Sequence, residues 1–222
     1  MKRFEIDGLG WYTVRGTNSR KRYQFLKNKI TAFYHDDYHS GDGLLRNKRK
    51  TVEFVITQLK NQFGSTPLHV LQAAQEDLVA ILQQDLSLIL DQSGYGNLTI
   101  CLIPRAKVEG SYEANQRLFK TVISKFADDS QNFINGTNYI FRHTDTRTTH
   151  LDRSGYGGDG ELPYPGITND TCTISSEVRG KDILLIDDLY TKDVGIDEDA
   201  IQALLDHGAN SVIFYSIGKT LK

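Results

Sequence analysis

Three short, largely apolar runs in the second half of the chain constrain its fold more than any other feature of the sequence. They are LTICLI, ILLI and VIFYSI, at residues 98–103, 183–186 and 212–217. Runs of this length are typical of strands that are buried on both faces of a sheet. Segments with helical spacing separate them, at residues 113–126 and 197–207, and Gly208 ends the second as glycine commonly ends a helix. The alternation of strand and helix predicts an α/β domain with a parallel, Rossmann-like sheet.

The first 96 residues have a different pattern and are expected to form a mainly helical extension. Helical spacing is found near residues 23–33, 46–63 and 67–91, and Pro67 lies where a first helical turn favours proline. We therefore expect an N-terminal extension at residues 1–96, covering the ligand site, and an α/β domain at residues 97–222. A strand-like segment at residues 139–142 belongs to the second part.

Composition excludes several classes of protein. None of the apolar runs approaches the ~20 residues that cross a bilayer, and no apolar stretch follows the charges at the start of the chain. Cys101 and Cys172 are too few for a disulfide scaffold or a four-thiolate zinc site. We therefore expect no membrane partner and a cytoplasmic location.

Charge is distributed unevenly along the chain. The whole chain has a formal net charge of -2, yet residues 1–50 carry twelve Lys and Arg against five Asp and Glu. Such a basic arm can meet the phosphates of nucleic acid or of a small ligand, and it can also dock on an acidic face of its own protein. Nucleic acid is the weaker interpretation, because the basic cluster at residues 46–50 lacks interleaved aromatic residues.

Two histidines near the end of this arm have a spacing that can hold a metal. His35 and His39 would share one face of a helix, with carboxylates between them. No third ligand can be identified, so a solvated polar turn is the preferred interpretation.

The segment ILLIDDLYTKDVG, residues 183–195, carries the most chemical information. Asp187 and Asp188 follow directly on a predicted buried strand, and parallel sheets bind their ligands at the carboxyl ends of strands. Carboxylates in this place can hold hydroxyls or magnesium-bound water, and the next helix can offer its amino end to a phosphate. They can also simply cap the loop, and the pattern alone leaves both interpretations open.

This segment resembles the phosphoribosyl-pyrophosphate motif of type I phosphoribosyltransferases, with Thr191 three positions after the acidic pair. The following HGANSVIFYS resembles the next helix and strand of the ComF-like competence proteins and the amidophosphoribosyltransferases. Residues 98–107 resemble the family's first strand and pyrophosphate loop, and residues 141–150 resemble its second strand and flexible loop. The resemblance covers residues 97–222.

The resemblance implies that magnesium and 5-phosphoribosyl-1-pyrophosphate bind at the strand ends, where a nitrogen nucleophile displaces pyrophosphate. It assigns Asp187 and Asp188 to the ribose hydroxyls and to Mg²⁺, directly or through water, with Asp188 stabilising positive charge on the ribose. It also implies that the loop at residues 143–166 closes over the site with Arg147, or Arg153, directed at the anion. The implied substrate-binding residues are Pro104, Arg105, Ala106 and Lys107 at the pyrophosphate, Thr191, Lys192, Asp193, Val194 and Gly195 at the 5-phosphate, and Lys219 near the base.

The phosphate loop departs from the family's pattern and leaves two functions open. Asp193 and Gly195 stand where the family usually has glycine followed by threonine or another small residue, and six carboxylates lie between residues 187 and 199. The first function is phosphoribosyl transfer to or from a nitrogen base or amine. The second is non-catalytic sensing of phosphoribosyl pyrophosphate or a nucleotide by a regulatory protein, associated with nucleic acid or a partner through the basic arm. A homodimer also stays open.

Overall fold

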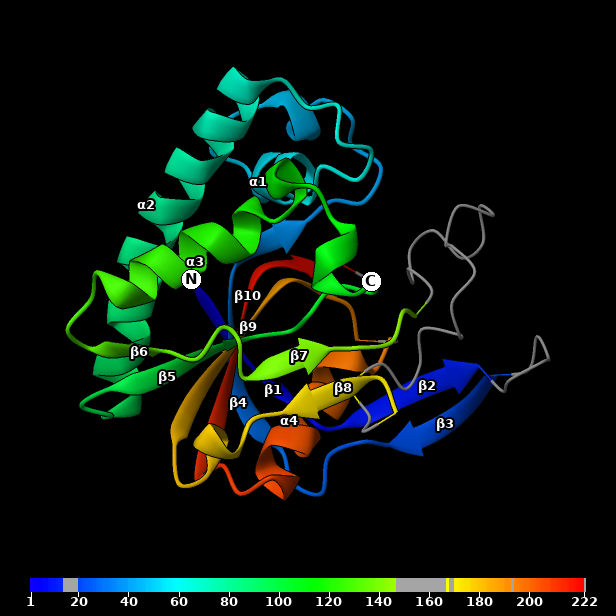
Figure 1. Cartoon of the computed structure of the whole chain (residues 1–222), viewed down its shortest axis with the longest axis vertical. Coiled ribbons are helices and arrows are strands. Elements are labelled where there is room, and N and C mark those ends of the chain that lie inside the picture. Colours follow the sequence, from blue (N-terminus) through cyan, green and yellow to red (C-terminus); the bar gives the residue numbers. More distant parts are fainter. Residues whose placement is uncertain (14–19, 147–166, 168–169, 193, 222) are drawn as a thin grey trace.

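The computed structural model describes residues 1–13, 20–146, 167, 170–192 and 194–221, with no side chain described from residue 10 to residue 20. A six-stranded sheet in the order β1-β4-β10-β9-β5-β6 forms its centre (Figure 1). Its strands are β1 (Lys2–Ile6), β4 (Ile30–Tyr38), β10 (Ser211–Thr220), β9 (Asp182–Tyr190), β5 (Leu98–Leu102) and β6 (Phe133–Asn135). All neighbours pair in parallel except β1, which is antiparallel to β4. The prediction of an α/β fold is confirmed, and the sheet that was expected to be parallel is mostly parallel, with one antiparallel edge strand.

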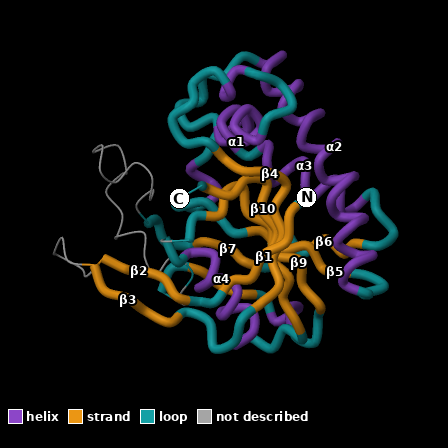
Figure 2. Tube along the Cα trace, turned by 180° about the vertical axis from the view of Figure 1, so that it is seen from behind, coloured by secondary structure: helices purple, strands orange, loops and turns teal. Residues whose placement is uncertain are grey.

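Helices cover both faces of this sheet. One face packs against α1 (Val52–Lys60), α2 (Leu68–Ser93) and α3 (Leu118–Asp128), and the other packs against α4 (Ile196–Asp206) (Figure 2). The two faces are separated by the alternation of side chains along β9, where Leu184 and Ile186 join the first core and Ile183 and Leu185 join the second. This double burial is the reason why the strand reads as an unbroken apolar run.

Two small antiparallel pairs lie outside the central sheet. They are the hairpin of β2 (Leu9–Thr13) with β3 (Arg20–Gln24), and the pair of β7 (Ile140–Arg142) with β8 (Cys172–Ile174). The predicted strand at residues 139–142 therefore exists, but it does not belong to the central sheet. No helix in the described ranges is long and apolar enough to cross a membrane.

The structure corrects the expected secondary structure of the first 96 residues. The helices expected at residues 46–63 and 67–91 are present as α1 and α2, but the helix expected near residues 23–33 is wrong, because β3 and β4 cover that region. Backbone hydrogen bonding to β10 decides the outcome, with Ala32 opposite Phe214 in the register. The N-terminal residues thus contribute β1 and β4 to the central sheet in addition to two helices.

The two histidines do not share a helix face, because residue 35 lies in β4 and residue 39 directly follows that strand. His35 Nδ1 is 2.9 Å from Asp85 of α2, and His39 Nδ1 is 3.0 Å from Glu53 of α1. Each histidine therefore pairs with a separate buried carboxylate, and the metal-binding spacing that a helix would give is absent.

Candidate functional site

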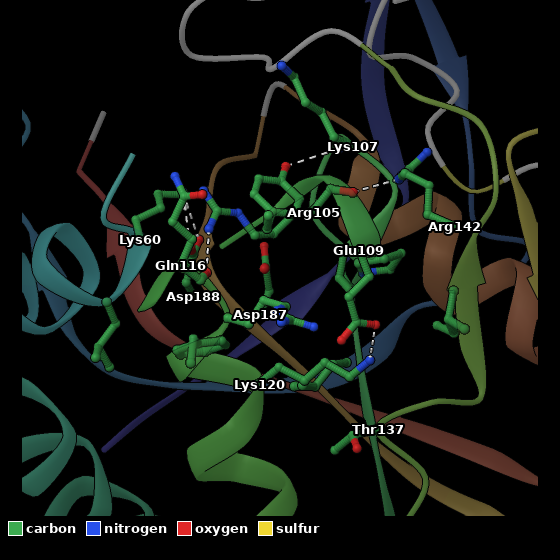
Figure 3. A pocket seen from close by; sticks show the side chains of 18 of the residues that line it. Lys60, Arg105, Lys107, Glu109, Gln116, Lys120, Thr137, Arg142, Asp187 and Asp188 are labelled. Carbon is green, nitrogen blue, oxygen red and sulfur yellow. Dashed lines mark hydrogen bonds and ion pairs between the residues drawn. The ribbon is translucent and has the colours of Figure 1, made fainter. Parts of the chain in front are cut away.

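A cavity lies beside the carboxyl ends of β5 and β9, on the face of the sheet that carries α1 and α3 (Figure 3). Its wall is mixed, with apolar side chains such as Leu59 and Phe119 beside many charged ones. The charged residues of the lining are Lys60, Arg105, Lys107, Glu109, Arg117, Lys120, Arg142, Asp187 and Asp188. Six cations thus face three carboxylates in a chain whose formal net charge is -2, so the cavity is a local concentration of positive charge.

The acidic pair lies in this cavity, as its place after a buried run suggests. β9 continues beyond the pair to Tyr190, and Asp187 is opposite Ser216 of β10 in the parallel register. Burial raises the pKa of Asp187 to about 7, and the charge of Asp188 adds to the effect. Two adjacent carboxyls in a half-buried place can accept hydroxyl hydrogens or ligate a divalent cation.

Lys60 is a residue of the site that sequence reasoning missed. It is the last residue of α1, and its Nζ lies 2.9 Å from Oδ2 and 3.2 Å from Oδ1 of Asp188. Burial lowers the pKa of Lys60, but the carboxylates of Asp188 and Asp187 outweigh it and hold that pKa above its ordinary value. The two partners are separated by 128 residues, and no motif in the sequence links them.

The loop that follows β5 delivers a second cation to the cavity. Arg105 donates from Nη1 to the carbonyl oxygen of Gln116 at 2.7 Å, and its guanidinium carbon lies 4.2 Å from the centre of the Tyr112 ring. Pro104 and Lys107 also line the cavity. Ala106 is not among the lining residues, and its carbonyl oxygen instead accepts hydrogen bonds from Thr146.

Three further cations of the lining, Arg117, Lys120 and Arg142, were not singled out from the sequence. Lys120 of α3 is ion-paired with Glu109 at the wall of the cavity, as the dashed line in Figure 3 marks. Arg142 of β7 is 4% exposed and donates from Nε to the carbonyl oxygen of Arg105 at 2.6 Å. Burial lowers the pKa of this guanidinium, and its Nη1 has no hydrogen-bond partner among the described atoms. A buried guanidinium nitrogen of this kind favours an anion nearby.

The residues expected around a 5-phosphate do not line this cavity. Thr191, Val194 and Gly195 form the turn between β9 and α4, with the Val194 amide donating to the Thr191 carbonyl oxygen at 3.0 Å. Lys192 lies 3.5 Å from a carboxylate oxygen of Asp7. Asp193 lies outside the described residues, as do Arg147, Arg153 and most of the expected loop at residues 143–166.

Lys219, expected near the base, also lies elsewhere. Its Nζ is 5.3 Å from the ring centre of Tyr34 and 5.6 Å from that of Phe4. Those rings belong to β4 and β1, and Lys219 is absent from the cavity lining. Lys219 therefore contacts aromatic rings near β1, the edge strand of the sheet, and not the cavity.

The amino end of α4 is filled by the chain's own carboxyls. Asp197 is 3% exposed and Glu198 is 1% exposed. Tyr190 donates to Glu198 Oε1 at 2.8 Å, while Oδ1 of Asp197 and Oε2 of Glu198 have no partner among the described atoms. Burial raises the pKa of both groups, that of Glu198 to about 7. The positive end of this helix dipole is already occupied by acidic groups.

Comparison with known proteins adds no assignment. No protein-family model and no curated protein sequence matches this chain. The structure by itself defines an α/β protein with a mostly parallel, mixed six-stranded sheet and a charged cavity at the ends of two of its strands.

Proposed function

We propose that the protein binds 5-phosphoribosyl-1-pyrophosphate together with Mg²⁺ in this cavity and transfers the phosphoribosyl group to or from a nitrogen base or amine. One observation carries the proposal: the acidic pair of β9 and the cations that follow β5 line the same cavity. The ligand has ribose hydroxyls that suit carboxylates and a pyrophosphate that suits Lys and Arg. A site for it needs both kinds of group within the length of one small molecule.

The residues present also suit magnesium. Mg²⁺ is usually held by one or two carboxylates and completes its octahedron with water and substrate phosphates. Asp187 and Asp188 offer such a donor set, and the described residues contain no group of three or more His, Cys, Asp or Glu placed to form an all-protein cage. A bound magnesium ion would supply charge neutralisation for the departing pyrophosphate.

The remaining roles follow from position in the cavity. Arg105 and the unpartnered nitrogen of Arg142 would hold the pyrophosphate. As the nitrogen nucleophile forms its bond to the anomeric carbon, the bond from that carbon to the pyrophosphate oxygen breaks, and Asp188 stabilises the positive charge that develops on the ribose. Side chains of α1 and α3, Leu59 and Phe119 among them, form an apolar wall suited to exclude water from the cationic ribose.

One observation favours a second function, the sensing of phosphoribosyl pyrophosphate or a nucleotide without turnover. In the resemblance, the turn before α4 holds the 5-phosphate, but here Asp197 and Glu198 are buried at that helix end. Buried acids repel a phosphate or must stay protonated beside it. A ligand held mainly by its pyrophosphate and ribose, with its 5-phosphate unbound, would bind without the fixed orientation of the anomeric carbon that transfer to a nitrogen nucleophile requires.

Calorimetric titration with magnesium and phosphoribosyl pyrophosphate tests the shared part of both functions. Binding by the natural chain should weaken more than about 100-fold, ~3 kcal/mol, in the double variant Asp187→Asn, Asp188→Asn. The matched control is Asp36→Asn with Asp37→Asn, a second acidic pair that is ion-paired with Lys2 on β1. Undiminished binding in the first double variant would remove the proposal.

A pyrophosphate-release assay over a panel of nitrogen bases and amines then separates the two functions. Release that depends on the acceptor supports transfer. Tight binding with no release across the panel supports the sensor.

A further inference from the structure

The acidic pair of β9 already has a cation of its own. Lys60 contacts both carboxylate oxygens of Asp188, and its side chain is only 26% exposed. We infer that Lys60 is the resident counter-ion of the acidic pair and that a divalent metal must displace it from Asp188. The inference deepens the proposed function, and it rests on that function only in taking Asp187 and Asp188 as the metal site.

Lys60 is held in this position by the residue that follows it. Asn61 ends α1 in the left-handed conformation, with φ of 38°, and is 2% exposed. Its side chain donates to the carbonyl oxygen of Asn115 at 3.3 Å and accepts from the amide of Thr66 at 3.1 Å. Asparagine tolerates this backbone conformation better than most residues do, and the amide contacts keep it there. The last turn of α1 is thus fixed against the segment that leads into α3.

The same junction also positions Arg105. Gln116 donates from Nε2 to the carbonyl oxygens of Asn61 and Gln62, and its own carbonyl oxygen accepts from Arg105 Nη1. Gln116 therefore helps to position both Lys60 and Arg105, and the positive charges of these two side chains repel each other. Arg105 has neutral hydrogen-bond partners, whereas Lys60 is paired with a carboxylate.

Charge balance explains why the lysine and a metal exclude one another. Asp188 can neutralise one nearby positive charge, and a divalent ion in contact with it would repel an ammonium group at similar distance. When a metal arrives with pyrophosphate, Lys60 can exchange Asp188 for a phosphate oxygen and every charge remains paired. When a metal arrives alone, Lys60 loses its partner and opposes binding. Metal affinity should therefore be low without the anion and higher with it.

Two lysines with nearly equal exposure permit a matched test. Lys60 is paired with Asp188 and Lys120 is paired with Glu109, and their side chains are 26% and 27% exposed. Figure 3 shows the two pairs at separate places around the cavity. Lys60→Met and Lys120→Met should both weaken binding of metal-free inorganic pyrophosphate several-fold. Only Lys60→Met should tighten the binding of Mg²⁺ alone, by at least about tenfold, measured by calorimetry.

Lys60→Arg and a labelling experiment keep the inference testable if Lys60→Met folds poorly. Lys60→Arg preserves the charge and should leave the affinity for Mg²⁺ alone within about twofold of the natural chain. In the natural chain, Mg²⁺ should increase the rate at which acetic anhydride modifies Lys60, quantified by mass spectrometry, because the freed ammonium loses its carboxylate partner. Lys120 should be modified at an unchanged rate.

The inference is overturned if Lys60→Met binds Mg²⁺ no more tightly than the natural chain, or if Mg²⁺ leaves the labelling of Lys60 unchanged. These measurements use no phosphoribosyl ligand. A chain that fails to bind phosphoribosyl pyrophosphate therefore removes the proposed function, while tighter metal binding by Lys60→Met still supports the lysine's role.

Discussion

The cavity beside β5 and the amino end of α4 are supplied by the same strand but have opposite chemistry. β9 contributes Asp187 and Asp188 to the cavity and Tyr190 to the α4 end, and the carboxyl of Asp187 also interacts with that of Asp197 at the α4 end. The cavity lining has twice as many cations as carboxylates, whereas the first turn of α4 contains Asp197, Glu198 and Asp199. The difference teaches that a helix amino end is an anion site only when the chain's own acids leave it open.

The two places also differ in how their carboxyls are balanced. Asp188 has an ammonium partner at 2.9 Å. Glu198 accepts hydrogen bonds from the hydroxyl of Tyr190 and from its own backbone, and burial raises its pKa to about 7. Asp199 accepts from the amide of Ile167, and burial raises its pKa to about 6. The α4 end therefore holds carboxylic acids over part of the physiological pH range, whereas the cavity combines an ion-paired carboxylate, Asp188, with a second carboxyl, Asp187, whose pKa is also raised to about 7.

Among the single substitutions, the largest effect is expected for Arg105, one of the six cations of the cavity lining. Replacing Arg105 with Ala should weaken pyrophosphate binding by about 100-fold, ~2.7 kcal/mol, because a charge-assisted contact to the anion is lost. Titration calorimetry with inorganic pyrophosphate measures it. Arg3→Ala, on the exposed edge strand β1, is the matched control and should change nothing. Equal losses in both variants would show that the cavity has no special role in anion binding.

The next effect concerns stability at the α4 end. A carboxyl whose pKa is raised in the folded state favours folding below its unfolded pKa of 4.5, and that contribution is lost as pH rises through about 7. Glu198→Gln cannot ionise, so it should exceed the natural chain in unfolding free energy at pH 8 by about 2 kcal/mol and equal it near pH 4. Urea unfolding at both pH values measures the difference. The exposed Glu177→Gln should show no such pH dependence, and an identical profile for both variants would contradict the burial argument.

A smaller effect is expected in the pH dependence of the cavity. Since the pKa of Asp187 is raised to about 7, its carboxyl becomes protonated, and less able to bind Mg²⁺, as pH falls below that value. The affinity for Mg²⁺ should fall about tenfold between pH 8 and pH 6, ~1.4 kcal/mol, and stay level above pH 8. Titration of the metal alone avoids the ionisation of a phosphate ligand. A flat profile would show that Asp187 takes no part in holding the metal.

The smallest effect is expected for Gly195, and it tests whether the cavity and the amino end of α4 bind different parts of the ligand. Gly195 has a φ of 79°, and a Cβ added there would lie 2.7 Å from the ring of Phe25. Gly195→Ala should lower the unfolding free energy by about 1 kcal/mol, since alanine is strained in this conformation. Pyrophosphate affinity should stay within twofold, because the turn does not line the cavity. A large loss of phosphoribosyl-pyrophosphate affinity with pyrophosphate affinity intact would place the 5-phosphate at the α4 end after all.

The sequence by itself determined those strands and helices whose burial leaves a recognisable pattern of apolar residues within the segment. β5, β9 and β10 are apolar runs because both faces of each strand are covered, and α4 ends where Gly208 follows it. The acidic pair could also be found, because it directly continues one of these runs. Its position in a cavity at strand ends then follows from the rule that ligands bind at the carboxyl edge of a parallel sheet.

Only the tertiary structure decided which distant residues join that pair. Residues 23–33 read locally as a helix, yet their last part forms the start of β4, because β10 offers it hydrogen bonds from more than 170 residues further along the chain. Lys60 reaches Asp188 because Asn61 and Gln116 fix the end of α1, and Arg142 reaches Arg105 from β7. The acids of α4 read as favourable for a helix dipole, but their burial depends on the surrounding fold. The spacing of apolar residues within a segment indicates its secondary structure and its buried faces. The partner of a charged side chain depends instead on which distant segments pack together, and no pattern within one segment shows that.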